Sequence, residues 1–127
     1  LGPAQGLYEQ CTRVPAGVDT YHIAGQLAVD KDGAIVGRND FATQFHQVFE
    51  NMGEVLKALG ESYDSVISFH TFMIHSQHIP VFMELRGALF PMLFSTTNYP
   101  PNTLLIIDRL VAEEFLFELE AVVAATE

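Results

Sequence analysis

The sequence is short of cysteine, of basic residues and of long apolar runs, and each shortage excludes a class of protein. A single cysteine, Cys11, excludes a disulfide framework within the chain and a cysteine-rich zinc site. Six Lys and Arg against 16 Asp and Glu give a net charge of -10, which disfavours nucleic acid and anionic membranes as partners. No apolar run approaches the roughly 18 residues that span a bilayer, and no secretion signal is visible. We therefore expect a soluble cytoplasmic protein.

The chain has ample apolar material for one core. Hydrophobic residues make up 49% of its 127 residues and ten residues are Phe. No linker or repeat divides the chain, so we expect a single domain over residues 1–127. Charged residues account for only 17%, which is little for the surface of a monomer. This shortage predicts that part of the surface is buried in an oligomer.

Periodic patterns predict both helices and strands. Apolar residues recur at three- and four-residue steps over residues 41–59, which predicts a helix capped by Asn39 or Asp40 and ended by Gly60. A second helix is expected over residues 79–94. Strands are expected over residues 7–14, 21–29, 34–36, 65–75, 103–108 and 115–124.

The order ββ(β)αβαββ predicts an α+β sandwich, in which two helices lie on one face of a mixed sheet. Pro91 falls inside the second helix and is expected to kink it or end it early. Gly25 lies inside a strand, which is typical of a bulge or of a close approach to the backbone. The opposite face of the sheet stays uncovered in one chain, and we expect a partner subunit there.

Two glutamates of the last strand are candidate acid–base residues. Glu118 and Glu120 stand two apart and share a face, whereas Phe117 and Leu119 point to the core. A carboxylate held at a subunit interface is partly desolvated, which raises its pKa towards the range useful for acid–base catalysis. The alternative is an exposed strand face or a structural hydrogen bond at the interface.

Other reactive side chains are less informative. His70 and His75 stand five apart on a predicted strand and so point to opposite faces, which argues against a three-ligand metal site. Surface or interface positions are favoured for the histidines, which are His22, His46, His70, His75 and His78. Cys11 has no activating neighbour and is expected to be a buried thiol. No phosphate loop, nucleophile elbow or dinucleotide fingerprint is present.

Several short motifs, taken together in their order and spacing, resemble the Rid (YjgF-like) family. They are residues 6–10, residues 23–27 with residues 30–33, Gln44 and Gln47 with residues 50–52 and 55–60, residues 66–73, and residues 118–121. The resemblance covers residues 6–124. It implies a chorismate-mutase-like fold, assembled as a homotrimer with sites in three clefts between subunits.

The resemblance also implies a chemistry. The best-known members hydrolyse reactive imines and enamines with neither metal nor organic cofactor. Carried over by position, Glu118 matches the glutamate that handles the attacking water, Tyr8 the first-strand tyrosine and Gly25 the pocket glycine.

One family residue does not carry over. The family's Pro-Ala-Arg-Thr-like segment is here Pro-Pro-Asn-Thr at residues 100–103, so Asn102 stands where the arginine that holds a substrate carboxylate is expected. An uncharged amide binds a carboxylate far less well than a guanidinium does. The change predicts poor turnover of 2-imino acids, unless another group such as Arg13 or Arg109 anchors the substrate.

Three functions remain open from the sequence. The first is an atypical hydrolase or deaminase of a small imine, enamine or related metabolite, with Glu118 as acid and base. The second is a non-catalytic trimer that binds a small metabolite, and the third is an interaction scaffold with vestigial clefts. Glu118 and Tyr8 favour chemistry, whereas Asn102 favours a lost or altered substrate.

Overall fold

The computed structural model describes residues 1–126, and its elements follow the order βαβαββ. Two short 3-10 helices, η1 and η2, precede β2 and α2. The bounds are β1 Thr20–Gln26, α1 Phe41–Ala58, η1 Tyr63–Ser65, β2 Val66–Met73, η2 Ser76–His78, α2 Ile79–Leu93, β3 Asn102–Ile106 and β4 Phe117–Ala124.

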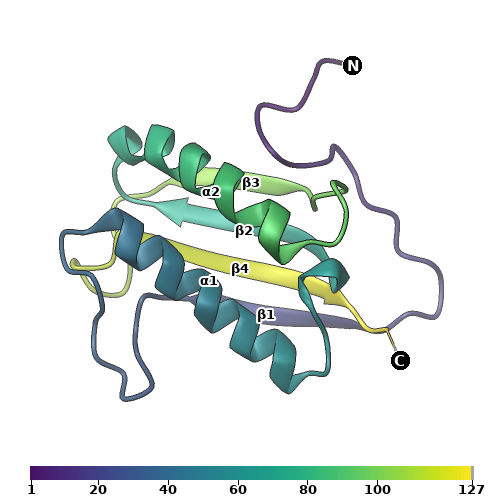
Figure 1. The fold of residues 1–127 in the computed structure, drawn as a ribbon, viewed down its shortest axis with the longest axis horizontal. Coiled ribbons are helices and arrows are strands. Elements are labelled where there is room, and N and C mark those ends of the chain that lie inside the picture. Colours follow the sequence, from purple (N-terminus) through teal and green to yellow (C-terminus); the bar gives the residue numbers. More distant parts are fainter. Residues whose placement is uncertain (127) are drawn as a thin grey trace.

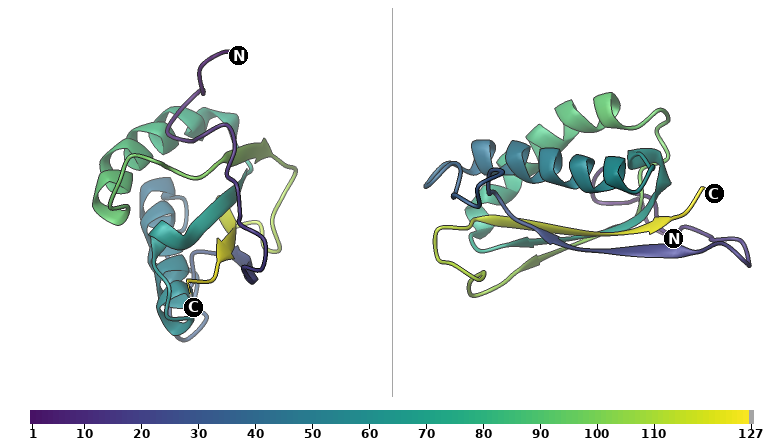
Figure 2. Two further views of the ribbon diagram at one scale, coloured as in Figure 1. Left: turned by 90° about the vertical axis from the view of Figure 1, so that its right-hand side faces the viewer. Right: turned by 90° about the horizontal axis from the view of Figure 1, so that it is seen from below.

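The four strands form one mixed sheet in the order β1-β4-β2-β3. Strand β2 runs parallel to β3 and antiparallel to β4, and β4 is antiparallel to β1. Both helices cover the same face of this sheet, and its other face is bare (Figures 1 and 2). The predicted α+β layering is therefore confirmed, including the uncovered sheet face.

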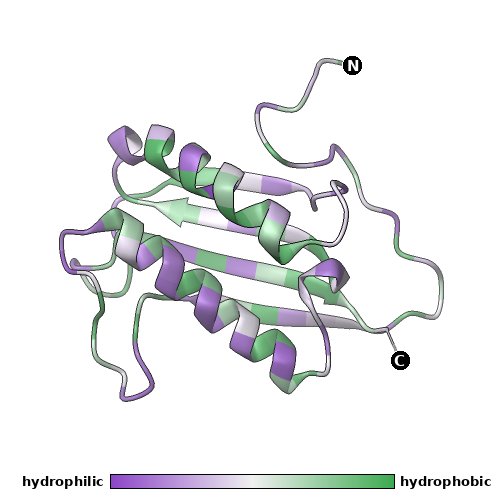
Figure 3. Cartoon of the chain, viewed as in Figure 1, coloured by the Kyte–Doolittle hydropathy of each residue, from purple (hydrophilic) through white to green (hydrophobic). Residues whose placement is uncertain are grey.

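The core lies between the helices and the sheet and is largely aromatic. The apolar stripe of α1 is buried as predicted, with Phe45 fully buried and Phe49 4% exposed. The ring centroid of Phe117 lies 5.5 Å from that of Phe45 and 6.0 Å from that of Phe49, within the usual range for aromatic pairs. Buried and half-buried residues alternate along β4. In Figure 3 the first half of this strand shows the matching alternation of hydrophobic and hydrophilic residues. This alternation fixes which side chains of β4 face the core and which face outward.

Polar side chains of α1 hold the neighbouring loops in place. The Asp40 carboxylate caps the helix by accepting from the Thr43 N–H at 3.1 Å. The buried Gln44 amide donates to the Glu114 carbonyl at 2.9 Å and accepts from the Leu116 N–H at 2.8 Å. The Asn51 amide donates to two carbonyls of residues 27–29 at 2.9 Å each. These bonds give a structural reason for the polar residues in this helix.

The predicted first strand is absent. Residues 7–14 form irregular chain beside α2 and β3 (Figure 1), where the Glu9 N–H donates to the Tyr99 carbonyl at 3.0 Å. Leu7 packs against the core but Cys11 is exposed, so the expectation of a buried thiol is also wrong. The segment lacks the alternating apolar residues that would bury one side of a strand.

The other differences are small. Residues 34–36 form a single bridge, Val29 to Ile35, rather than a strand. Pro91 lies within α2, which ends two residues later at Leu93. The remaining predicted elements are present, with ends that differ by at most three residues. Neither helix combines the length and apolar character that crossing a membrane requires.

Candidate functional site

The four predicted site residues fall into two pairs. Glu118 and Gly25 meet on the strands β4 and β1, whereas Tyr8 and Asn102 line one cavity beside β3. The two pairs are described in turn, because the structure gives each a different geometry.

Gly25 makes room for the Glu118 carboxylate. The pairing of β1 with β4 shifts between Ile23 and Gln26, so the bulge expected at this glycine is present. A Cβ atom on Gly25 would lie 1.8 Å from Oε2 of Glu118 and 2.6 Å from its Cδ. Any side chain at residue 25 would therefore displace the carboxylate, which lies directly over the bulged backbone.

Glu118 is half-buried on the open face of the sheet, and its environment disfavours the charged form. Burial raises the pKa of Glu118 above the ordinary value for a glutamate, and repulsion from the Glu120 carboxylate raises it further. Glu120 in turn lies opposite His70 on β2, with 3.4 Å between His70 Nδ1 and Glu120 Oε1. The open face thus carries a carboxyl group suited to giving and taking a proton.

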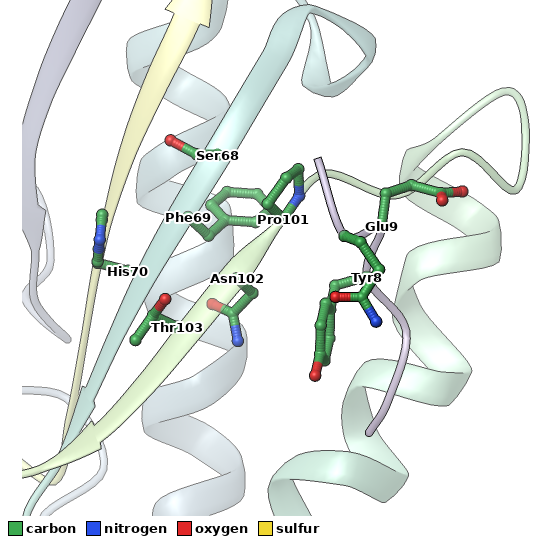
Figure 4. Close-up of a pocket in the computed structure, with 9 residues that line it drawn as sticks. Tyr8, Glu9, Ser68, Phe69, His70, Pro101, Asn102 and Thr103 are labelled. Carbon is green, nitrogen blue, oxygen red and sulfur yellow. The ribbon is translucent and has the colours of Figure 1, made fainter. Parts of the chain in front are cut away.

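Tyr8 and Asn102 lie on the walls of a cavity of about 260 Å³ between the N-terminal segment and the start of β3 (Figure 4). The Thr71 hydroxyl donates to Asn102 Oδ1 at 2.7 Å, which leaves the amide N–H groups of Asn102 as donors for another partner. The Tyr8 hydroxyl oxygen accepts from the Gln5 N–H at 3.0 Å and still carries its own proton. This cavity therefore offers neutral hydrogen-bond donors.

Within one chain, the pair Glu118 and Gly25 lies apart from the pair Tyr8 and Asn102. Asn102 pairs with Phe69 and Glu118 pairs with Phe72, on opposite edges of β2 and about 10 Å apart along that strand. Asn102 also bonds Thr71, which is buried beneath the helices, whereas Glu118 faces the open side. Within residues 1–126, the four residues do not share one pocket.

The histidines are dispersed. His22 and His46 are exposed, and His70 is half-buried on the open face. The His75 and His78 rings are 5.4 Å apart, and burial together with the charge of His75 lowers the pKa of His78. No group of three or more His, Cys, Asp or Glu within residues 1–126 is placed to hold a metal ion.

One charged residue of this region is missed by the sequence analysis. Arg86 of α2 is only 3% exposed, and its Cζ lies 4.9 Å from the centre of the Phe82 ring and 6.0 Å from that of Phe90. Because Phe82, Arg86 and Phe90 follow at four-residue steps, the helical spacing already placed the arginine on the buried face. That spacing is the signal that could have identified it.

Comparison with known proteins identifies the family. Residues 3–125 match the family described as Endoribonuclease L-PSP, which is nearly the whole chain. The chain belongs to the Rid (YjgF-like) family. No curated protein sequence matches it significantly.

Solved structures agree with this assignment. The Rid-family protein YyfB from Yersinia pestis is 27% identical, with a TM-score of 0.74 over 92% of this chain and 82% of that chain. RidA from an Antarctic Psychrobacter is also 27% identical, with a TM-score of 0.71 over 97% and 92% of the two chains. TdcF from E. coli, solved with bound serine, shares the fold at 24% identity and a TM-score of 0.75, over 99% of this chain and 91% of that chain. The Rid-type fold expected from the sequence motifs is therefore confirmed.

Proposed function

We propose that this Rid-family chain is a hydrolase of a small imine, enamine or related metabolite, with Glu118 as acid and base. The observation that carries the proposal is the Glu118 carboxyl group, which lies over the Gly25 bulge with a pKa raised by burial and by Glu120. Within residues 1–126, the charged side chains other than Glu118 are exposed except for Glu61, Arg86 and Glu120, so a desolvated carboxylate over a bulged backbone is a candidate for chemistry.

Hydrolysis of an imine needs a group that takes and gives protons in both of its steps. In the first step, the Glu118 carboxylate takes a proton from water while the oxygen of that water bonds to the imine carbon, and it passes this proton to the nitrogen, which gives a neutral carbinolamine. In the second step, Glu118 takes the proton of the carbinolamine hydroxyl and gives it to the nitrogen as the C–N bond breaks, so ammonia leaves and a carbonyl compound is the second product. One water is consumed for each ammonia released. The reaction as proposed requires no cofactor.

We further propose that the working unit is a homotrimer, with each site in a cleft between two subunits. Two observations support this assembly: the open sheet face carries Glu118, and the Tyr8–Asn102 cavity lies on a different side of the same chain. A second copy of the chain supplies the missing half of the site in this arrangement. Light scattering should then report about three times 14.1 kDa.

A non-catalytic metabolite-binding trimer is the second candidate. It is favoured by Asn102, which offers hydrogen bonds without charge, and by TdcF from E. coli, a protein of the same fold that was solved with bound serine. The description of the family as an endoribonuclease does not lead us to propose RNA cleavage, because a net charge of -10 repels a polyanion.

The deciding experiment compares glutamine substitutions of the two glutamates of β4. Imines are generated in situ, 2-imino acids by an amino-acid oxidase and uncharged imines by an amine oxidase, and the accelerated release of ammonia is measured. Glu118→Gln keeps the shape of the side chain but removes the base, so turnover should fall by about 10²–10⁴-fold while the trimer persists. Glu120→Gln, on the same face, should lose far less. Equal damage from both variants, or an unaffected Glu118→Gln enzyme, contradicts the assignment of Glu118. No acceleration by the wild type on either imine class favours the binding protein.

A further inference from the structure

The sheet has two neighbouring carboxylates on its open face and few groups that could balance their charge. The strands β1 to β4 contain no Lys or Arg, and the basic side chains that they carry are His22 and His70. His70 lies directly opposite Glu120, with 3.4 Å between His70 Nδ1 and Glu120 Oε1. His22 lies opposite the apolar Val122 instead. The protonated form of His70 is therefore the cation that the strand pairing brings to the carboxylates.

The ion pair between His70 and Glu120 is a poor stabiliser of the fold. Both side chains are 44% exposed, and water screens an ion pair of that exposure so well that it contributes little to stability. It is nevertheless the one ion pair found in residues 1–126 that joins two strands, since the others join residues of loops. Its effect is therefore to be sought in the neighbouring carboxyl group, Glu118.

Glu120 acts on Glu118 through its charge. The two residues are two apart on one face of β4, which places their Cα atoms about 7 Å from each other. Burial raises the pKa of Glu118, and repulsion from Glu120 raises it further. A cation at Glu120 offsets this repulsion. An imidazole is mostly protonated in the acidic range where carboxyl groups titrate, so the cation is present when Glu118 loses its proton.

Few other charges reach His70. On β3 its neighbour is the uncharged Thr103, and that strand has no charged residue. Tyr8 and Glu9 of the N-terminal segment line the same cavity as His70, but the imidazole lies on the β4 side of β2, away from Tyr8 (Figure 4). Glu9 is exposed, so water and salt screen its charge. Within residues 1–126, Glu120 is thus the charged group at ion-pair distance from His70.

We propose that His70 is a positioning residue for the acid–base group of β4, because it holds the Glu120 carboxylate and offsets its charge beside Glu118. The Glu118 carboxylate then remains ionised, and able to act as a base, down to a lower pH than the two glutamates alone would allow. His70 itself transfers no proton in this role. For turnover, this inference rests on the proposed function. The electrostatic link between the three side chains stands by itself.

The link can be measured without a substrate. The full chain is labelled with ¹³C at the glutamate carboxyl groups and titrated by NMR, and the Glu118 signal is assigned by its absence in Glu118→Gln. His70→Gln should raise the titration midpoint of Glu118 by at least about 0.3 pH units, the effect of one charge at roughly 10 Å in water. His70→Lys keeps a cation and should restore the midpoint to the wild-type value or below it. His46→Gln, the same change at an exposed residue of α1, should leave the midpoint unchanged.

A double variant tests whether His70 acts through Glu120. In the Glu120→Gln background, His70→Gln should shift the midpoint of Glu118 much less than it does in the wild type. An equal shift in both backgrounds overturns the proposal, as does an unchanged midpoint in His70→Gln. In turnover, the acid limb of the kcat/KM profile should move to higher pH in His70→Gln. A wild type that turns over no imine contradicts the proposed function, whereas the NMR midpoints alone decide the role of His70.

Discussion

The two faces of the sheet differ in the charged side chains that they bury. On the open face, Glu118 and Glu120 are half-buried carboxylates beside each other and beside His70. On the helix-covered face, the buried polar side chains of Gln44 and Thr71 are hydrogen-bonded, whereas the buried Arg86 donates only to the sulfur of Met83 and its Nε has no acceptor within residues 1–126.

The difference lies in how each group can respond to desolvation. A carboxyl group that is disfavoured as an anion takes up a proton, which moves its pKa upward and makes it useful as an acid and a base. A guanidinium has no such escape, so it requires a counterion. The open face is therefore suited to proton transfer, whereas the covered face has no group that answers burial by changing its protonation.

Removal of a large aromatic side chain from each face should give the largest effects. Phe117 is fully buried on the covered face, where its ring centroid lies 5.5 Å from that of Phe45. Phe117→Ala should lower the free energy of unfolding by about 3–5 kcal/mol, because the cavity lies at the centre of the core. Chemical denaturation measures this loss.

Phe72 is the matched position on the open face. It lies on β2 opposite Glu118, and its neighbour Met73 lies opposite Phe117. It is half-buried in one chain, so Phe72→Ala should cost a single chain much less. If the open face is the subunit interface, the same change should shift the light-scattering mass towards 14.1 kDa. A variant that keeps its full oligomeric mass would contradict the placing of the interface on this face.

The covered face could be predicted from the sequence because periodicity determines it. Apolar residues recur at three- and four-residue steps in α1 and at every second residue in the first half of β4. These patterns predict which side chains face inward, and the structure confirms both predictions. Residues 7–14 have no such pattern, and the strand predicted there is absent. The Rid-like motifs in this segment describe a resemblance in sequence, whereas a strand needs a neighbour to pair with, and this segment has no strand partner in the described chain.

The site was only partly predictable for a related reason. The bulge at Gly25 and the outward direction of Glu118 follow from local sequence, and both are present. Arg86 was missed because arginine is rarely buried, although its four-residue spacing to Phe82 and Phe90 places it on the buried face of the helix. The separation of Tyr8 and Asn102 from Glu118 depends on strand order, which no local pattern contains.

Substitution of Gly25 should nearly reproduce the loss of Glu118. In Gly25→Ala, the new Cβ takes the place of the Glu118 carboxylate, which must move away from the bulge. Turnover of imines should fall by at least about 100-fold with the fold retained, as measured by ammonia release and circular dichroism.

The control for this change is Gly53→Ala in α1, where the nearest atom to a new Cβ is a Tyr63 carbon at 3.6 Å. That variant should be slightly more stable than the wild type, by about 0.5–1 kcal/mol, and equally active. Full activity of Gly25→Ala would show that the position of the carboxylate over the bulge does not matter.

The smallest expected effect is a shift in pH dependence on neutralising Glu120. Burial is the larger cause of the raised pKa of Glu118, and repulsion from Glu120 is the smaller one. Glu120→Gln removes only the repulsion, so the pKa of Glu118 should fall part of the way back towards the ordinary glutamate value. Since the base must be ionised to act, the acid limb of the kcat/KM profile should move to lower pH.

The same sign applies to stability. A carboxyl group whose folded pKa is raised stabilises the fold while protonated, and that contribution is lost as the pH rises through the folded pKa. In Glu120→Gln this loss should begin at the same pH, near the pKa of the unfolded chain, but end at lower pH and be smaller in size. The control is Glu54→Gln on α1, which changes the net charge equally but lies on the helix side of the sheet. It should leave the acid limb of the kcat/KM profile where it is in the wild type. If the acid limb of the kcat/KM profile stays in place in Glu120→Gln, or moves to higher pH, then Glu120 does not raise the pKa of Glu118 in the working enzyme.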